Sequence, residues 1–212
     1  MSVFPEPQIP SSAGGPAWEV AMLFPPQGQW DESDYFRAQT NRMIELVDGT
    51  LETLPTPTWL HQMLVRYLCR RLEDQIESRL GGMVLFAPLP VRLFPGTIRE
   101  PDVLYCLPQN VPANANGYPD RIDLVIEIVS EGDAARHRDY VAKRADYAKA
   151  GVAEYWIVDP ETKVITRMVL ENGQYNESVF QIGESAASLL FPEFILDVAA
   201  VFQIGSTKPS GS

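Results

Sequence analysis

Residues 122–159 read IDLVIEIVSEGDAARHRDYVAKRADYAKAGVAEYWIVD, and this stretch decides the fold class. Its two ends, 122–129 and 153–159, are apolar almost throughout, which is typical of strands that are covered on both faces. Between them, residues 134–150 have a helical pattern that ends at Gly151. A strand–helix–strand unit of this kind predicts two parallel strands joined by a right-handed crossover.

The residues before this unit predict a hairpin, a long helix and further strands. In MIELVDGTLETL, Asp48-Gly49 separates two apolar-rich runs and indicates a two-residue hairpin turn. Thr56 to Thr58 then open a helix in which leucines recur at spacings of four, until Gly81-Gly82 ends it. We expect strands at 83–93, bent by its prolines, and at 99–106.

The residues after the unit predict a second hairpin and a small terminal helix. Asn172-Gly173 separates strand-like runs at 163–170 and 174–180, and the helix is expected near 193–202. Together these elements predict an α+β fold with one mixed β-sheet flanked by helices.

A single domain is expected at 18–203 of the 212 residues, with a flexible N-terminal arm at 1–17 and a flexible C-terminal tail at 204–212. Both ends are rich in small and turn-forming residues and lack periodicity.

The composition, 45% hydrophobic and 21% charged, is ordinary for a soluble globular protein, and no apolar run is long enough to cross a bilayer. No basic residue precedes Arg37, so the positive region of a secretory signal is missing and a cytoplasmic location is expected. Cys69 and Cys106 have no metal-ligand spacing and are interpreted as buried thiols. The formal net charge of −11 counts against a large nucleic-acid footprint, although a local basic patch remains compatible with it.

Glu127 is the most informative candidate site residue. In IDLVIEIV it shares a strand face with Val125 and Val129, and both faces of this strand are expected to be covered. Because carboxylates are almost never fully buried unless they are paired, a charge at this position favours a functional role.

Glu45 and Asp102 are ambiguous when each is considered alone. Glu45 lies inside the apolar run MIELV, where it either binds a cation or belongs to an edge strand, solvated or bridged to an arginine. Asp102 follows Pro101 and directly precedes the apolar run VLYC, so it is either a site residue or a residue that caps a loop at the strand entry.

Lys143 lies at the border of the apolar arc formed by Tyr140, Val141 and other residues of the expected helix. A helical ion pair with Asp139, four residues earlier, would explain it equally well. Arg144, near the centre of the arc, is expected to bind a sheet carboxylate or to reach a phosphate.

The positions of Glu45, Asp102, Glu127 and Lys143, in this order along the chain, resemble those of the PD-(D/E)XK nuclease superfamily. More narrowly, the chain resembles the Uma-two family of restriction-endonuclease-like proteins. The resemblance covers most of the chain and is carried by IELVDGTLETLPTP, APLPVRL, EPDVLY, DLVIEIVS, HRDYVAKRADYAKAGVAEYWIVDP and FPEFILDVAAVF. The chain departs from the family at Ser130-Glu131-Gly132, where a Ser-Pro-Ser run is usual, so Glu131 is a candidate additional ligand.

The resemblance implies a restriction-endonuclease-like core and a catalytic set of Glu45, Asp102, Glu127 and Lys143. Asp102 and Glu127 would bind the metal with the backbone carbonyl of Ile128, and Glu45 would lie close by. The superfamily lysine usually follows the strand acid by two residues, where this chain has Val129, and Lys143 matches the position of a lysine supplied by the next helix. Such hard oxygen ligands suit Mg²⁺ or Mn²⁺.

The leading hypothesis is therefore a metal-dependent endonuclease that hydrolyses phosphodiester bonds of DNA. A nuclease-fold module that binds nucleic acid without cutting is the second hypothesis. A third is an interaction protein assembled through the 163–180 hairpin. A homodimer is compatible with each of them, and no membrane partner is expected.

Overall fold

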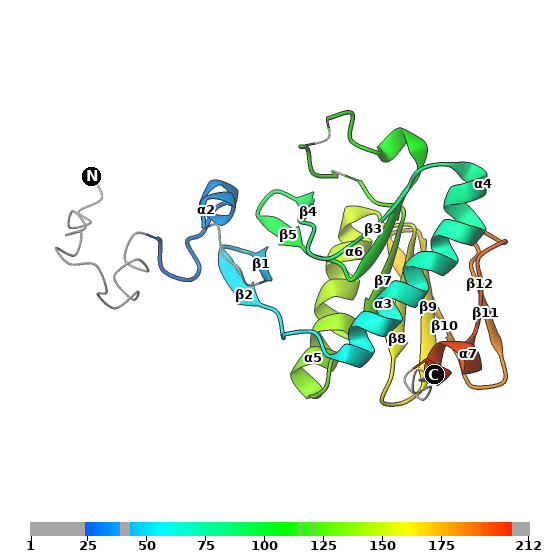
Figure 1. The fold of residues 1–212 in the computed structure, drawn as a ribbon. Coiled ribbons are helices and arrows are strands. Elements are labelled where there is room, and N and C mark those ends of the chain that lie inside the picture. Colours follow the sequence, from blue (N-terminus) through cyan, green and yellow to red (C-terminus); the bar gives the residue numbers. More distant parts are fainter. Residues whose placement is uncertain (1–23, 39–42, 115, 120, 205–212) are drawn as a thin grey trace, which may run out of the picture.

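The computed structural model describes residues 24–38, 43–114, 116–119 and 121–204 (Figure 1). The expected arm at 1–17 and the expected tail beyond residue 204 lie outside this described part. Within it, no helix is both long and apolar enough to span a membrane.

The central sheet has six strands in the order β10-β9-β8-β7-β6-β3. Strands β7 and β8 pair in parallel and all other neighbours pair antiparallel, so the predicted mixed sheet with a parallel central pair is confirmed. The bounds are β3 (Met83–Phe86), β6 (Val103–Cys106), β7 (Leu124–Ile128), β8 (Glu154–Asp159), β9 (Val164–Glu171) and β10 (Gln174–Phe180).

A second, four-stranded sheet corrects the expectation of a single sheet. Its order is β2-β1-β5-β4, and a small third sheet pairs β11 with β12. The runs 83–93 and 99–106 are each divided between the first two sheets, because prolines, which lack the N–H that a ladder needs, interrupt both. The bounds are β1 (Ile44–Val47), β2 (Thr50–Thr53), β4 (Val91–Phe94), β5 (Thr97–Arg99), β11 (Ser185–Ala187) and β12 (Ile195–Asp197).

The two long helical segments appear where the sequence predicts them. The Thr58 side chain caps the first by accepting the N–H of His61, and Gly151, with φ of 78°, ends the second. Each segment contains one π-helical turn, η1 or η3. The bounds are α2 (Glu32–Arg37), α3 (Trp59–Leu72), η1 (Glu73–Glu77), α4 (Ser78–Leu80), the 3₁₀ turn η2 (Pro108–Asn110), α5 (Asp133–His137), η3 (Arg138–Lys143), α6 (Arg144–Ala150) and α7 (Val198–Gln203).

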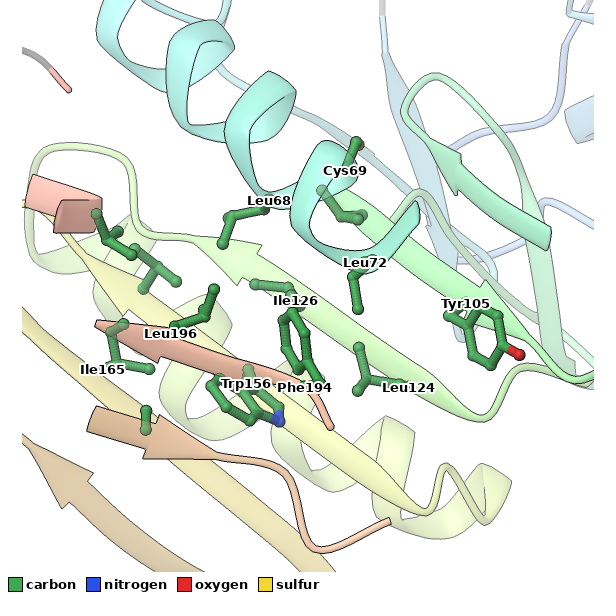
Figure 2. Packing of buried hydrophobic residues seen from close by; sticks show 14 of the residues in the cluster. Leu68, Cys69, Leu72, Tyr105, Leu124, Ile126, Trp156, Ile165, Phe194 and Leu196 are labelled. Carbon is green, nitrogen blue, oxygen red and sulfur yellow. The ribbon is translucent and has the colours of Figure 1, made fainter. Parts of the chain in front are cut away.

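Helices cover both faces of the central sheet, so β7 is buried on both sides as predicted. On one face, Leu68 and Leu72 of α3 pack toward Leu124 and Ile126 (Figure 2). On the other face, Tyr147 of α6 packs with alternate residues of β7 and β8. Glu127 belongs to this second face, because side chains alternate along a strand.

Candidate active site

Glu127 lies in the middle of the buried sheet and is 2% exposed. Its Oε1 accepts hydrogen bonds from Lys143 Nζ at 2.8 Å and from Tyr147 Oη at 2.6 Å. Burial raises the pKa of Glu127 to about 8, even though the Lys143 charge acts to lower it. The buried acid that the sequence pattern indicated is therefore present, and it has polar partners.

Lys143 is also buried, and it bridges two carboxylates. Its Nζ lies 2.8 Å from Glu127 Oε1 and 3.2 Å from Glu45 Oε1. The alternative pairing with Asp139 is not what the structure shows, because Asp139 pairs with Arg138 at 3.3 Å. These acids raise the pKa of Lys143 above its usual value despite its burial.

The face that the helix presents to the sheet overlaps the predicted apolar arc only in part, because Tyr147 is buried but Val141 is not. Asp139, Lys143 and Tyr147, spaced by four residues, are buried, whereas Val141 is 53% exposed. The π-helical turn η3 lies in this part of the helix, and Lys143 and Tyr147 both donate to Glu127 of the sheet. Arg144 pairs with Glu177 of β10 at 2.7 Å, so its expected bond to a sheet carboxylate is observed.

Glu45 is fully buried on β1, an inner strand of the second sheet. Its Oε2 accepts from Arg99 at 2.7 Å, and its Oε1 accepts the N–H of Glu100 at 3.0 Å and forms an ion pair with Lys143 Nζ at 3.2 Å. The arginine bridge weighed as an alternative is thus present, although not at an edge. Burial acts to raise the pKa of Glu45, but Lys143 and Arg99 hold it below its usual value.

Asp102 lies between β5 and β6, where the chain passes from one sheet to the other. Its Oδ2 accepts the N–H of Ile128 at 2.8 Å and lies 3.1 Å from His61 Nε2. Burial acts to raise the pKa of Asp102, but the His61 hydrogen bond and charge hold it below its usual value. The backbone of β7 thus brings Asp102 beside the strand that carries Glu127.

A cavity of about 240 Å³ lies next to most of these side chains. Asp102, Glu127, Ile128 and Lys143 line it, together with His61 and Asp139. A neighbouring cavity of about 590 Å³ shares the wall formed by His61 and Ile128. Of the expected catalytic residues, Glu45 does not line the first cavity, and the candidate ligand Glu131 lines the second cavity and not the first.

The donor set fits a small hard cation held by few protein ligands. The hydrogen bonds to Asp102 and Glu127 engage Oδ2 and Oε1, so within the described chain Oδ1 and Oε2 have no donor. No group of three or more His, Cys, Asp or Glu side chains among the described residues is arranged as a metal site. Two carboxylates are nevertheless the number that commonly hold Mg²⁺, with water and substrate phosphate completing its shell.

Sequence reasoning assigned no site role to Tyr147, Asp139 and Arg99. The first two share a helical spacing of four with Lys143, and this spacing places all three side chains on one stripe. Arg99, in REPDVLYC, carries no local pattern that distinguishes it from a surface arginine.

Comparisons with known proteins agree with this architecture. A family model described as "Uma2: Putative restriction endonuclease" matches residues 30–199. The crystal structure of a protein from Anabaena variabilis ATCC 29413, described as "a putative nuclease belonging to DUF820", is similar with a TM-score of 0.69 and 16% sequence identity. The similarity covers 82% of this chain and 98% of that chain, and it confirms the expected α+β fold. Comparison with curated proteins gave no match.

Proposed function

The chain belongs to the Uma2 family, and on this premise we propose that it is a metal-dependent nuclease that hydrolyses phosphodiester bonds of DNA. One observation carries the proposal: Asp102 and Glu127, each with one carboxylate oxygen that has no donor within the described chain, line a cavity that the buried Lys143 also lines. An acid pair with an adjacent ammonium group suits a polyanionic substrate whose reaction develops negative charge.

The residues that would hold Mg²⁺ or Mn²⁺ are Asp102, Glu127 and the carbonyl of Ile128. The N–H and C=O of one strand residue point to the same side, and the Ile128 N–H already faces Asp102. A bound ion of this kind supplies Lewis acidity toward a phosphate oxygen and makes a bound water more acidic.

Lys143 is proposed to act on the attacking water or on the phosphate oxygens. An ammonium group has three N–H donors; one donates to Glu127, and Glu45 forms an ion pair with the same nitrogen. At least one further donor is therefore available for a group in the cavity. Glu45, whose two oxygens both have donors, is proposed to fix Lys143 rather than to bind the metal.

The same arrangement supports a relation to PD-(D/E)XK nucleases in which the lysine has moved. Val129, at the usual lysine position, belongs to the apolar core, whereas Lys143 reaches Glu127 from the helix. An ammonium group thus contacts the strand acid from a different element.

Plasmid cleavage tests the proposal. The wild-type protein with Mn²⁺ or Mg²⁺ is expected to nick supercoiled DNA, and Asp102→Asn, which preserves side-chain shape, to lose about a hundredfold or more of this activity. Asp133→Asn, at an exposed position in α5, is the matched control and is expected to retain activity. Equal nicking by wild type and Asp102→Asn would refute the assignment.

Calorimetry with Mn²⁺ separates this function from that of a non-cleaving module. Binding that Asp102→Asn weakens supports the metal site. Absence of binding to the wild-type protein would favour the module that binds nucleic acid without cutting it.

A further inference from the structure

Helix α3 has an exposed stripe that the proposed catalytic chemistry does not use. Its inner face, which includes Leu68 and Leu72, is buried against the sheet (Figure 2). Trp59, Gln62, Arg66 and Arg70 are exposed and spaced by three or four residues, so they form one continuous outer stripe.

The outer stripe is cationic in an otherwise acidic chain. Helix α3 contains Arg66, Arg70 and Arg71 and no acidic residue, although acids outnumber bases 28 to 17 in the whole chain. Within the described part of the chain, Arg66 and Arg70 have no ion pair. Several other surface arginines are paired with acids, namely Arg37 with Asp34, Arg92 with Glu32, Arg136 with Asp159 and Glu161, and Arg144 with Glu177.

The stripe begins at the rim of the proposed active site. Thr58 and Leu60 line the larger cavity, and His61, which binds Asp102, lines both cavities. Trp59 lies between Thr58 and Leu60 in the sequence, in the first turn of α3, and is 82% exposed. From Trp59 to Arg70 the helix rises about 17 Å, at 1.5 Å per residue, so the stripe leads from the rim along the outside of the molecule.

We propose that the outer stripe of α3 binds a single-stranded stretch of the nucleic-acid substrate. This inference rests on the proposed function for the place of the reacting phosphate. Arg66 and Arg70 contact the phosphate backbone, and Trp59 stacks on an unpaired base beside the cavity. Clustered cations without protein counterions attract phosphates, and an exposed indole stacks on bases whose faces are open, as they are in a single strand.

Binding of a fluorescein-labelled thymidylate 20-mer to the full-length protein tests the arginines. Fluorescence anisotropy is measured in EDTA, which prevents cleavage, over a range of NaCl concentrations. A plot of the logarithm of the binding constant against the logarithm of the salt concentration has a negative slope. For Arg66→Gln/Arg70→Gln, the magnitude of this slope should decrease by about 1.4, because each single-strand phosphate contact contributes about 0.7. The same relation gives an affinity loss of about 25-fold at 0.1 M salt.

Arg37→Gln/Arg121→Gln is the matched control, because it removes the same charge at exposed positions outside the stripe. It is expected to leave the slope unchanged. The proposal is overturned if this control decreases the magnitude of the slope as much as the stripe variant does. It is also overturned if the stripe variant keeps the wild-type slope.

Trp59→Ala tests stacking separately from charge. It should lower affinity about fivefold or more without changing the salt slope, and Trp59→Phe should retain most of the affinity. A duplex of the same length that binds as tightly as the single strand, with Trp59→Ala without effect, would refute the stacking role.

Hydrolysis of bis(4-nitrophenyl) phosphate with Mn²⁺ distinguishes failure of this inference from failure of the proposed function. This substrate is too small to span the stripe, so the stripe variants should hydrolyse it as the wild type does. Wild-type hydrolysis combined with stripe-independent DNA binding would overturn only the inference. Stripe-dependent DNA binding without hydrolysis would overturn only the nuclease function.

Discussion

Glu127 lies in a strand that is buried on both faces, and the one ammonium group that pairs with it, that of Lys143, also pairs with Glu45. Asp102 and Asp139 add negative charge around it. Isolated buried carboxylates are costly, so the protein holds Glu127 with a pKa of about 8. This value makes the proposed metal site sensitive to pH.

The affinity for Mn²⁺ is expected to rise with pH between about 6 and 8. A carboxyl group with a pKa of about 8 keeps its proton in this range, and a divalent ion must displace that proton in order to bind. The dissociation constant should therefore fall by up to about tenfold per pH unit and level off above pH 8. Calorimetry in several buffers measures both the affinity and the proton released, and a pH-independent affinity would contradict the assignment.

In the metal-free protein, the raised pKa of Glu127 makes folding stability decrease as the pH rises, whereas the affinity for Mn²⁺ increases. Because the folded pKa of Glu127 is raised above the ordinary value of 4.5, the folded state holds this proton between about pH 4.5 and 8 and the unfolded chain does not. The stabilising contribution is complete below pH 4.5 and is lost as the pH rises to 8.

Replacing Lys143 with Met should destabilise the fold as well as abolish the proposed nuclease activity. The change leaves Glu127 and Glu45 without their shared cation, and breaking a buried ion pair costs about 3–5 kcal/mol. Lys149→Met, on the exposed side of the same helical segment, removes only a contact with the Phe94 ring and should cost about 1 kcal/mol or less. Urea denaturation at pH 8 compares the two variants, and equal losses would show that Lys143 has no special structural role.

At the scale of elements, the sequence predicts local structure well where one pattern determines it. Asp48-Gly49 forms the expected hairpin turn, with both residues at positive φ, and the helix that begins after Thr58 is correctly placed. The division of 83–93 between two sheets was not predicted, because strand partners depend on residues distant in sequence. The contact of Lys143 with Glu45 was not predicted for the same reason, because it depends on how the second sheet packs against the helix.

Two glycines at the ends of helical segments should respond very differently to substitution. Gly82 and Gly151 both have positive φ, but a Cβ at Gly82 would lie 2.3 Å from the carbonyl oxygen of Cys106, whereas a Cβ at Gly151 meets no atom within 4 Å. Gly151→Ala should cost about 1–2 kcal/mol, the ordinary penalty of the left-handed conformation. Gly82→Ala should cost about 1–3 kcal/mol more, because β3 must shift relative to β6. Thermal denaturation measures the difference, and equal melting temperatures would contradict it.

At the scale of the whole molecule, the open edges of the central sheet are β10 and β3. The β9–β10 hairpin appears where the interaction hypothesis placed it, and among the described strands β10 pairs with β9 alone, so its outer edge is open to another chain. Assembly into a homodimer stays a prediction. Light scattering at high protein concentration tests it, and a monomer would count against this edge as an interface.

The second sheet is joined to the rest of the molecule by the buried Arg99. Its guanidinium binds Glu45 and Glu52 of that sheet and Asp146 of helix α6, at 2.7, 3.0 and 2.7 Å. Arg99 is 1% exposed and Glu45 is fully buried, so the bond between them is protected from solvent, whereas the side chain of Glu52 is 42% exposed. Because Glu45 in turn holds Lys143, the packing of the second sheet determines the geometry of the proposed site.

Arg99→Met is therefore expected to lower the free energy of unfolding by about 3–5 kcal/mol near neutral pH, because it leaves the fully buried Glu45 with a weaker set of partners. Arg92→Met removes an exposed pair with Glu32 and should cost about 1 kcal/mol or less. Arg99 helps to hold the pKa of Glu45 below its usual value, so its stabilising effect is present above pH 4.5 and is lost as the pH falls through the folded pKa. The difference between wild type and Arg99→Met should accordingly shrink in acid, whereas a difference independent of pH would indicate that Arg99 acts through packing alone.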